Sequence, residues 1–86
     1  MKSSTHSRMK LFISNLPLAF TEEHLRELLD EHCQILQLEL LKVKETGKSK
    51  GMAFLEVAEP RQGRLLIAAL NGLDVYSRRL GVCEVL

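Results

Sequence analysis

Apolar and polar side chains alternate along four segments of the chain, the pattern expected for strands with one buried and one exposed face. Two further segments repeat leucine or isoleucine at three- and four-residue spacing, which predicts amphipathic helices. The expected helices begin after the N-cap residue Thr21 and at Pro60. The expected strands span residues 11–14, 35–43, 50–57 and 80–85.

The order of these elements is strand, helix, strand, strand, helix, strand. This order predicts an α+β, ferredoxin-like βαββαβ fold, with a four-stranded antiparallel sheet and two helices on one of its faces. The other face would stay open to solvent, with the first and third strands as its central pair. Gly63 lies inside the second helix. It weakens that helix by up to ~1 kcal/mol relative to Ala, and its small size lets the helix approach the sheet closely.

The strand at residues 50–57 carries different chemistry on its two faces. Its apolar face consists of Ala53, Leu55 and Val57, and its other face of Lys50, Met52, Phe54 and Glu56. A cation, a thioether, an aromatic ring and a carboxylate suit contact with something flat and negatively charged. Phe12 occupies the matching face of the first strand, so Phe12 and Phe54 are expected side by side on the open face. Two exposed rings at that position indicate stacking on a ligand.

These two strands resemble the motifs of a known family. Residues 11–16, Leu-Phe-Ile-Ser-Asn-Leu, resemble the six-residue motif of the RNA recognition motif (RRM) family, and residues 50–57 resemble its eight-residue motif. The eight-residue match departs at Met52 and Val57, where the family has aromatic residues. The resemblance covers residues 10–86, which we expect to form a single RRM-like domain, and residues 1–9 are expected to be a flexible tail or linker.

The resemblance implies single-stranded RNA binding by base stacking on the sheet. It implies that Phe12 stacks one base, that Phe54 stacks a base or packs on a ribose, and that Lys50 pairs with a phosphate. Met52 can pack on a base but is not a π platform, so its presence is expected to lower affinity. The full set of expected RNA-binding residues is Lys10, Phe12, Asn15, Leu41, Lys48, Lys50, Met52, Phe54 and Arg79.

Composition limits the other possibilities. Twelve Lys and Arg against eleven Asp and Glu leave a net charge of +1, which excludes a broad polybasic binder and makes any nucleic-acid site local. Cys33 and Cys83 form no C-x-x-C pair, so no metal site or cofactor is expected. With no signal-peptide pattern and no apolar run of the ~20 residues that a membrane span needs, we expect a nuclear or cytoplasmic protein, neither secreted nor membrane-bound, and a monomer as an isolated domain.

A second function class remains open, a degenerate RRM that binds another protein. Glu39, outward on the second strand, repels phosphate, although it can accept hydrogen bonds from base amino groups. The acidic first helix and an apolar patch on the second helix are the expected protein-binding surfaces. The patch consists of Leu65, Ala68 and Ala69. An enzyme is not expected, because no phosphate-binding glycine loop and no nucleophile with a base are present.

The turn after the first helix departs from the family pattern at two positions. Cys33 stands where the family commonly has Gly, so we expect either strain or a differently shaped turn. His32 stands where a core aromatic residue is common, and we expect a partly buried histidine with satisfied hydrogen bonds rather than a metal ligand.

Overall fold

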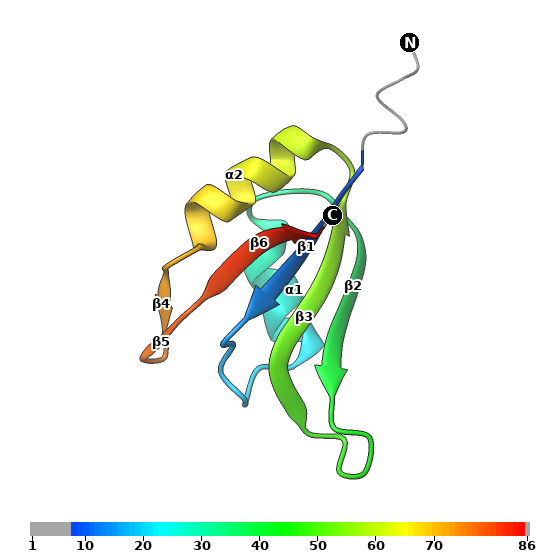
Figure 1. Cartoon of the computed structure of the whole chain (residues 1–86), viewed down its shortest axis with the longest axis vertical. Coiled ribbons are helices and arrows are strands. Elements are labelled where there is room, and N and C mark those ends of the chain that lie inside the picture. Colours follow the sequence, from blue (N-terminus) through cyan, green and yellow to red (C-terminus); the bar gives the residue numbers. More distant parts are fainter. Residues whose placement is uncertain (1–7, 86) are drawn as a thin grey trace.

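A computed structural model describes residues 8–85, which form two helices and six strands (Figure 1). The strands are β1 (Met9–Ser14), β2 (Ile35–Lys42), β3 (Ser49–Val57), β4 (Asp74–Val75), β5 (Arg78–Arg79) and β6 (Gly81–Val85). The helices are α1 (Glu22–Asp30) and α2 (Pro60–Leu70). Four strands form one antiparallel sheet in the order β2-β3-β1-β6. The predicted ferredoxin-like fold is therefore confirmed, with β1 and β3 at its centre.

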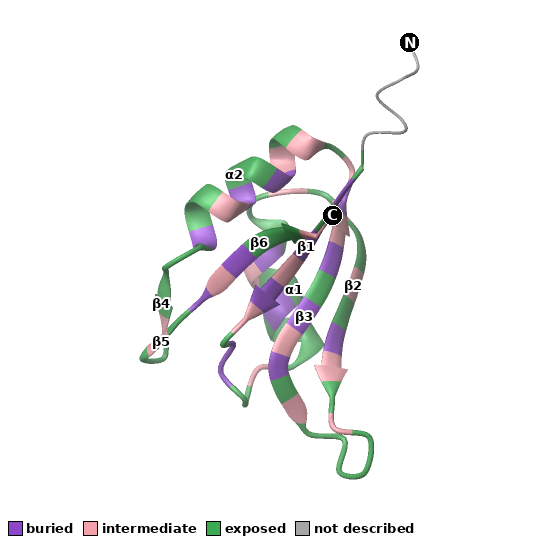
Figure 2. Ribbon diagram, in the orientation of Figure 1, coloured by how far each residue is buried: buried purple, intermediate pink, exposed green. Residues whose placement is uncertain are grey.

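The core lies between the sheet and both helices. Leu11 and Ile13 of β1 are fully buried, and they belong to one apolar cluster with Leu25 of α1 and Leu66 of α2. Burial alternates residue by residue along β1 and β3 (Figure 2), because successive side chains of a strand point to opposite faces. One face of the sheet is thus covered by helices, and the other carries the exposed side chains.

The folded domain begins at least one residue before the expected boundary at residue 10. Met9, assigned to the tail, is the first residue of β1 and is only 5% exposed. Its side chain packs under α2 at Gly63, where an added methyl group would overlap the Met9 sulfur. The close approach expected at Gly63 is thereby confirmed, and it explains why Met9 is part of the domain. The remainder of the expected tail, apart from Arg8, lies outside the described residues.

Helix α1 begins with a reciprocal pair of capping bonds. The His24 backbone N–H donates to Thr21 Oγ1 at 3.2 Å, and the Thr21 N–H donates to His24 Nδ1 at 3.2 Å. This is a capping box in which histidine replaces the usual Glu or Gln. The predicted N-cap at Thr21 is confirmed.

The structure tests the expectations for Cys33 and His32 in the turn after α1. Cys33 does not adopt a positive φ, so the turn has a different shape and carries no left-handed strain there. Burial, with the nearby Asp30 carboxylate as a smaller cause, raises the pKa of the Cys33 thiol. His32 is exposed, which makes the prediction of a partly buried histidine wrong, because the chain leaves the helix at this point into solvent.

A small hairpin, not expected from the sequence, precedes the last strand. β4 and β5 pair through Asp74–Arg79 and Val75–Arg78, joined by Tyr76 and Ser77. Both joining residues have positive φ, at 49° and 68°, as a type I′ turn requires. Across the described residues 8–85, no helix is long and apolar enough to span a bilayer.

Candidate nucleic-acid interface

Side chains that point away from the helices form two rows across the open face of the sheet. The first row, here the aromatic row, follows the register from β2 to β6 and consists of Glu39, Phe54, Phe12 and Cys83. The second, here the polar row, consists of Gln37, Glu56, Lys10 and Val85. Directly paired residues of neighbouring strands present their side chains on the same face. Each row therefore forms a continuous strip that runs across all four strands, with one side chain from each strand.

The centre of the aromatic row is a pair of phenylalanine rings. The centroids of Phe12 and Phe54 lie 5.0 Å apart, and the ring planes are tilted by 47°. Phe54 is 39% exposed, and Phe12 is half-buried beside it. The predicted placement of the two rings side by side on the open face is correct. Such a pair offers an apolar surface to a flat ligand, at the cost of leaving aromatic area in water.

The polar row is largely charge-balanced within itself. Glu56 pairs directly with Lys10 in the register of β1 and β3, and Arg8 Nη1 lies 3.7 Å from Glu56 Oε2. The Glu56 side chain is only 15% exposed, whereas that of Arg8 is 59% exposed. Two cations therefore flank this carboxylate, and its negative charge contributes little repulsion towards an incoming anion.

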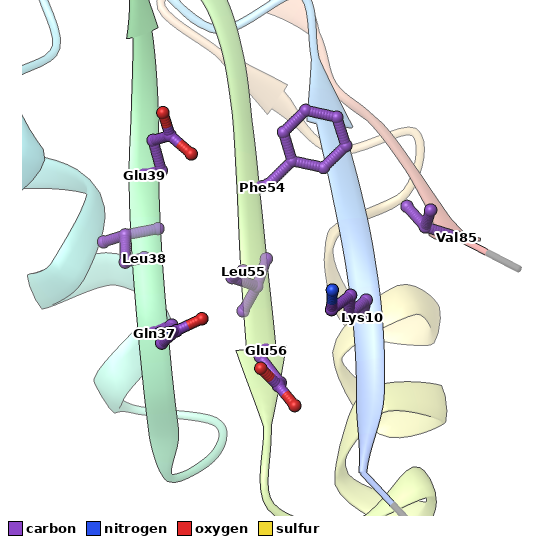
Figure 3. A pocket seen from close by; sticks show the side chains of 8 residues that line it. All are labelled: Lys10, Gln37, Leu38, Glu39, Phe54, Leu55, Glu56 and Val85. Atoms are coloured by element: carbon purple, nitrogen blue, oxygen red, sulfur yellow. The ribbon is translucent and has the colours of Figure 1, made fainter.

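A shallow hollow of about 560 Å³ lies between the two rows (Figure 3). We call it the sheet hollow, and it is lined by Lys10, Gln37, Leu38, Glu39, Phe54, Leu55, Glu56 and Val85. The side chains of Gln37 and Glu39 rise from β2 on one side, while Lys10 and Val85 lie on the other (Figure 3). Charged, amide and aromatic groups thus meet around a space open to solvent.

Gly51 shapes the start of β3. Its φ is +75°, and an added Cβ would lie 3.0 Å from the backbone oxygen of Leu16. The Leu16 N–H donates to the Gly51 carbonyl at 2.9 Å, and the Gly51 N–H donates to Ser49 Oγ at 2.9 Å. The register with β2 shifts at this position. The glycine of the eight-residue motif is therefore required by backbone geometry, and it ties β3 to the loop after β1.

The predicted cations lie near the ends of the strands. Lys48, in the loop between β2 and β3, and Lys50, near the start of β3, are both exposed. That loop is held by backbone bonds, from the Val43 N–H to the Lys48 carbonyl and from the Gly47 N–H to the Val43 carbonyl, both 2.7 Å. Arg79 lies in β5, where its Nε is 3.6 Å from Asp74 Oδ1 in an exposed pair. Such a pair is weak and leaves the guanidinium able to take another anion.

Asn15 already uses its amide within the protein. Its Nδ2 donates to the Arg79 carbonyl at 2.9 Å, and its Oδ1 accepts from Arg78 Nη1 at 3.1 Å. The residue also has a positive φ of 62°, which asparagine tolerates better than most residues. The side chain therefore joins the end of β1 to the β4–β5 hairpin.

The structure brings some of the predicted residues together and separates others. Lys10, Phe12 and Phe54 share one surface, and Met52 and Leu41 are half-buried at positions further along their strands. Asn15 and Arg79 lie at the end of β1 and on the hairpin. The sequence did not point to Gln37 or Val85, and only the register of the strands shows that both line the sheet hollow.

The expected protein-binding surfaces are accessible. Leu65 is 58% exposed on α2, and Ala68 and Ala69 are exposed beside it. On α1, Glu22, Glu23, Glu27 and Asp30 are exposed. A role for either surface in protein binding stays a prediction.

Comparison with known proteins gives consistent likenesses. The splicing factor U2AF 59 kDa subunit of Schizosaccharomyces pombe is 38% identical over 74 residues, which make up 86% of this chain but only 14% of that protein. The structure of the Sxl-lethal protein/RNA complex superposes with a TM-score of 0.85 at 27% identity, covering 96% of this chain and 48% of that one. The structure of the Rna15 RRM with bound RNA (GU) superposes with a TM-score of 0.81 at 26% identity, covering 88% of this chain and 81% of that one.

The family itself follows from a direct match. The profile of the RNA recognition motif family matches residues 11–81, which include the last four residues of β1, both helices and all of β3. This match spans the two strands that carry the aromatic row's phenylalanines. The chain belongs to the RNA recognition motif family.

Proposed function

We propose that this domain binds a short segment of single-stranded RNA on the open face of its sheet, as one module of a larger RNA-processing protein. The observation that carries the proposal is the exposed pair of Phe12 and Phe54, 5.0 Å apart at the centre of that face. Stacking of a base on an aromatic side chain contributes about 1–3 kcal/mol. Two adjacent rings can therefore hold two successive bases.

The cations supply the contacts to the RNA backbone. Lys10 lies in the polar row, and Arg79 lies on the β4–β5 hairpin. Lys48 lies in the β2–β3 loop, and Lys50 lies near the start of β3. Phosphate contacts fix the register of a nucleic acid, whereas contacts to bases select its sequence. A net charge of +1 makes these few local cations the main electrostatic attraction.

The identity of the relatives supports the wider role. The U2AF 59 kDa subunit is a splicing factor, and this chain matches only 14% of its length. We place the present domain by analogy in a protein that processes RNA in the nucleus, where neighbouring modules raise the affinity of one another through effective concentration.

The stacking mechanism is tested by removing both rings. The double variant Phe12→Ala, Phe54→Ala should lose at least about thirtyfold in affinity for pools of short single-stranded RNA, because two stacking platforms of about 1–3 kcal/mol each are lost. Fluorescence anisotropy measures the affinity, and circular dichroism checks that the variant is folded.

Tyr76→Ala is the matched control. Tyr76 is the most exposed large aromatic side chain of the described residues, at 77%, but it lies in the β4–β5 turn outside both rows. Its removal should leave the affinity unchanged. If the double variant binds as tightly as the wild type, base stacking on this face is not how the domain binds RNA.

A further inference from the structure

Glu39 occupies an unusual position for a carboxylate on this face. It is exposed at the end of the aromatic row and pairs directly with Phe54. Within residues 8–85 it makes neither an ion pair nor a side-chain hydrogen bond, in contrast to Glu56, whose Oε2 lies 3.7 Å from Arg8 Nη1. A free negative charge beside a stacking ring repels the phosphates of any RNA bound there. The charge is favourable only if the bound base offers hydrogen-bond donors to it.

The sheet hollow determines which part of a base Glu39 would meet. Phe54 forms one wall of the hollow, Glu39 rises from β2, and Lys10 rises from β1 (Figure 3). Strands β2 and β1 flank β3, so their axes are about 10 Å apart. A base seated against Phe54 can therefore turn one edge towards the Glu39 carboxylate, whereas Lys10 pairs with Glu56 and lies one row further along β1.

The four bases differ in what they present to these groups. A carboxylate only accepts hydrogen bonds, and a lysine only donates them. Guanine offers two adjacent donors, N1–H and the N2 amino group, which match the two carboxylate oxygens, and its O6 and N7 are acceptors for a cation. Uracil flanks its single N3–H with two carbonyl oxygens, and adenine and cytosine place a ring-nitrogen acceptor beside their amino group. These acceptors repel a carboxylate.

We propose that Glu39 is a specificity-determining residue that selects guanine at the position stacked on Phe54. The proposal rests on the proposed RNA-binding function and adds the base identity. It also accounts for a carboxylate on a face that receives a polyanion, since the repulsion then acts mainly against RNA without guanine at this position.

The test is a titration of the wild-type domain with five-nucleotide RNAs that differ only in the central base. The central residue is guanine, adenine, cytosine, uracil or inosine in a uridine background. A bidentate pair discriminates against the wrong base by about tenfold, so the guanine RNA should bind about ten times more tightly than the uracil RNA. Inosine lacks the N2 amino group, so it should lose several-fold relative to guanine.

The variant Glu39→Ala should remove this discrimination. Its affinity for the guanine and inosine RNAs should become equal, while its affinity for the uracil RNA should rise because a negative charge is gone. Glu45→Ala is the matched control, since it removes the same charge from the exposed β2–β3 loop away from the sheet hollow. That variant should bind all five RNAs somewhat more tightly and keep the guanine preference.

The outcomes separate this proposal from the function on which it rests. Equal wild-type affinity for all five RNAs, or a guanine preference that survives Glu39→Ala, overturns the role of Glu39 and leaves RNA binding intact. Failure of the wild-type domain to bind any of the five RNAs, when tested up to millimolar concentration, overturns the proposed function as well.

Discussion

At the scale of single residues, a few positions fix the shape of the open face through their backbone rather than their side chains. Gly51 combines a φ of +75° with a close approach to the Leu16 carbonyl. Gly47 has a similar φ of +72°, but no atom lies within 4 Å of an added Cβ. The two glycines therefore separate the cost of an unfavourable φ from the cost of a steric clash.

We predict that Gly51→Ala lowers the free energy of unfolding by more than about 2 kcal/mol, whereas Gly47→Ala lowers it by about 1 kcal/mol. A left-handed conformation costs an L-residue about 1–2 kcal/mol, and only position 51 adds a contact with rigid backbone. Urea denaturation of both variants measures the difference. Equal losses would mean that the loop after β1 yields easily at Leu16.

The residue scale is also where the sequence was least informative about the site. The aromatic pair could be predicted, because alternation alone puts Phe12 and Phe54 on one face. The sheet hollow could not, since Gln37, Glu56 and Val85 come together only through a register that includes two shifts in β2. The exposure of His32 depends on where α1 ends, and that boundary is poorly encoded locally.

At the scale of elements, each edge strand of the sheet donates a backbone hydrogen bond to a side chain at the end of a helix. On β6, the Val82 N–H donates to Asn71 Oδ1 at 3.0 Å, and on β2, the Leu40 N–H donates to Glu22 Oε2 at 3.3 Å. Both acceptors belong to the ends of helices, Asn71 as the C-cap of α2 and Glu22 as the first residue of α1. Each helix is thereby fastened to an edge of the sheet that it covers.

We predict that Asn71→Ala exposes the Val82 amide. A part-buried N–H without its partner costs about 1 kcal/mol or more, and hydrogen exchange at Val82 should accelerate at least about fivefold. Nuclear magnetic resonance follows this amide directly. Asn71→Asp keeps the acceptor oxygen and should keep the protection, so loss of protection in both variants would show that the amide group acts in some other way.

Most elements could be predicted from the sequence, and the exception has a physical reason. The periodicity of apolar residues predicts the long strands and both helices, and Thr21 and Pro60 mark where the helices begin. The β4–β5 hairpin has strands of two residues, too short for any alternation. Its turn is Tyr76-Ser77, without the Asn-Gly or Asp-Gly that usually marks two positive φ angles.

At the scale of the whole molecule, charge is nearly balanced but unevenly placed. The net charge is +1, while the exposed lysines of the β2–β3 loop and the arginines of the hairpin lie at the ends of strands and the exposed carboxylates of α1 lie on a helix. Association with a polyanion is then governed by a few cations near the open face and not by the overall charge.

We predict a shallow dependence of RNA affinity on salt. If Lys10, Lys48, Lys50 and Arg79 each contact one phosphate, the slope of log K against log salt concentration should be about −3, because single strands give roughly −0.7 per contact. Anisotropy titrations between low and high potassium chloride measure this slope. A slope steeper than about −6 would require phosphate contacts far beyond these four residues.

The end of the aromatic row has a practical consequence. Cys83 is exposed next to Phe12, whereas Cys33 is half-buried and its thiol has a raised pKa. A thiol reacts with alkylating reagents as its thiolate, so burial and the raised pKa both disfavour modification of Cys33. The natural sequence therefore offers a covalent attachment point for a fluorophore or spin label beside the two phenylalanines, without the introduction or removal of any cysteine.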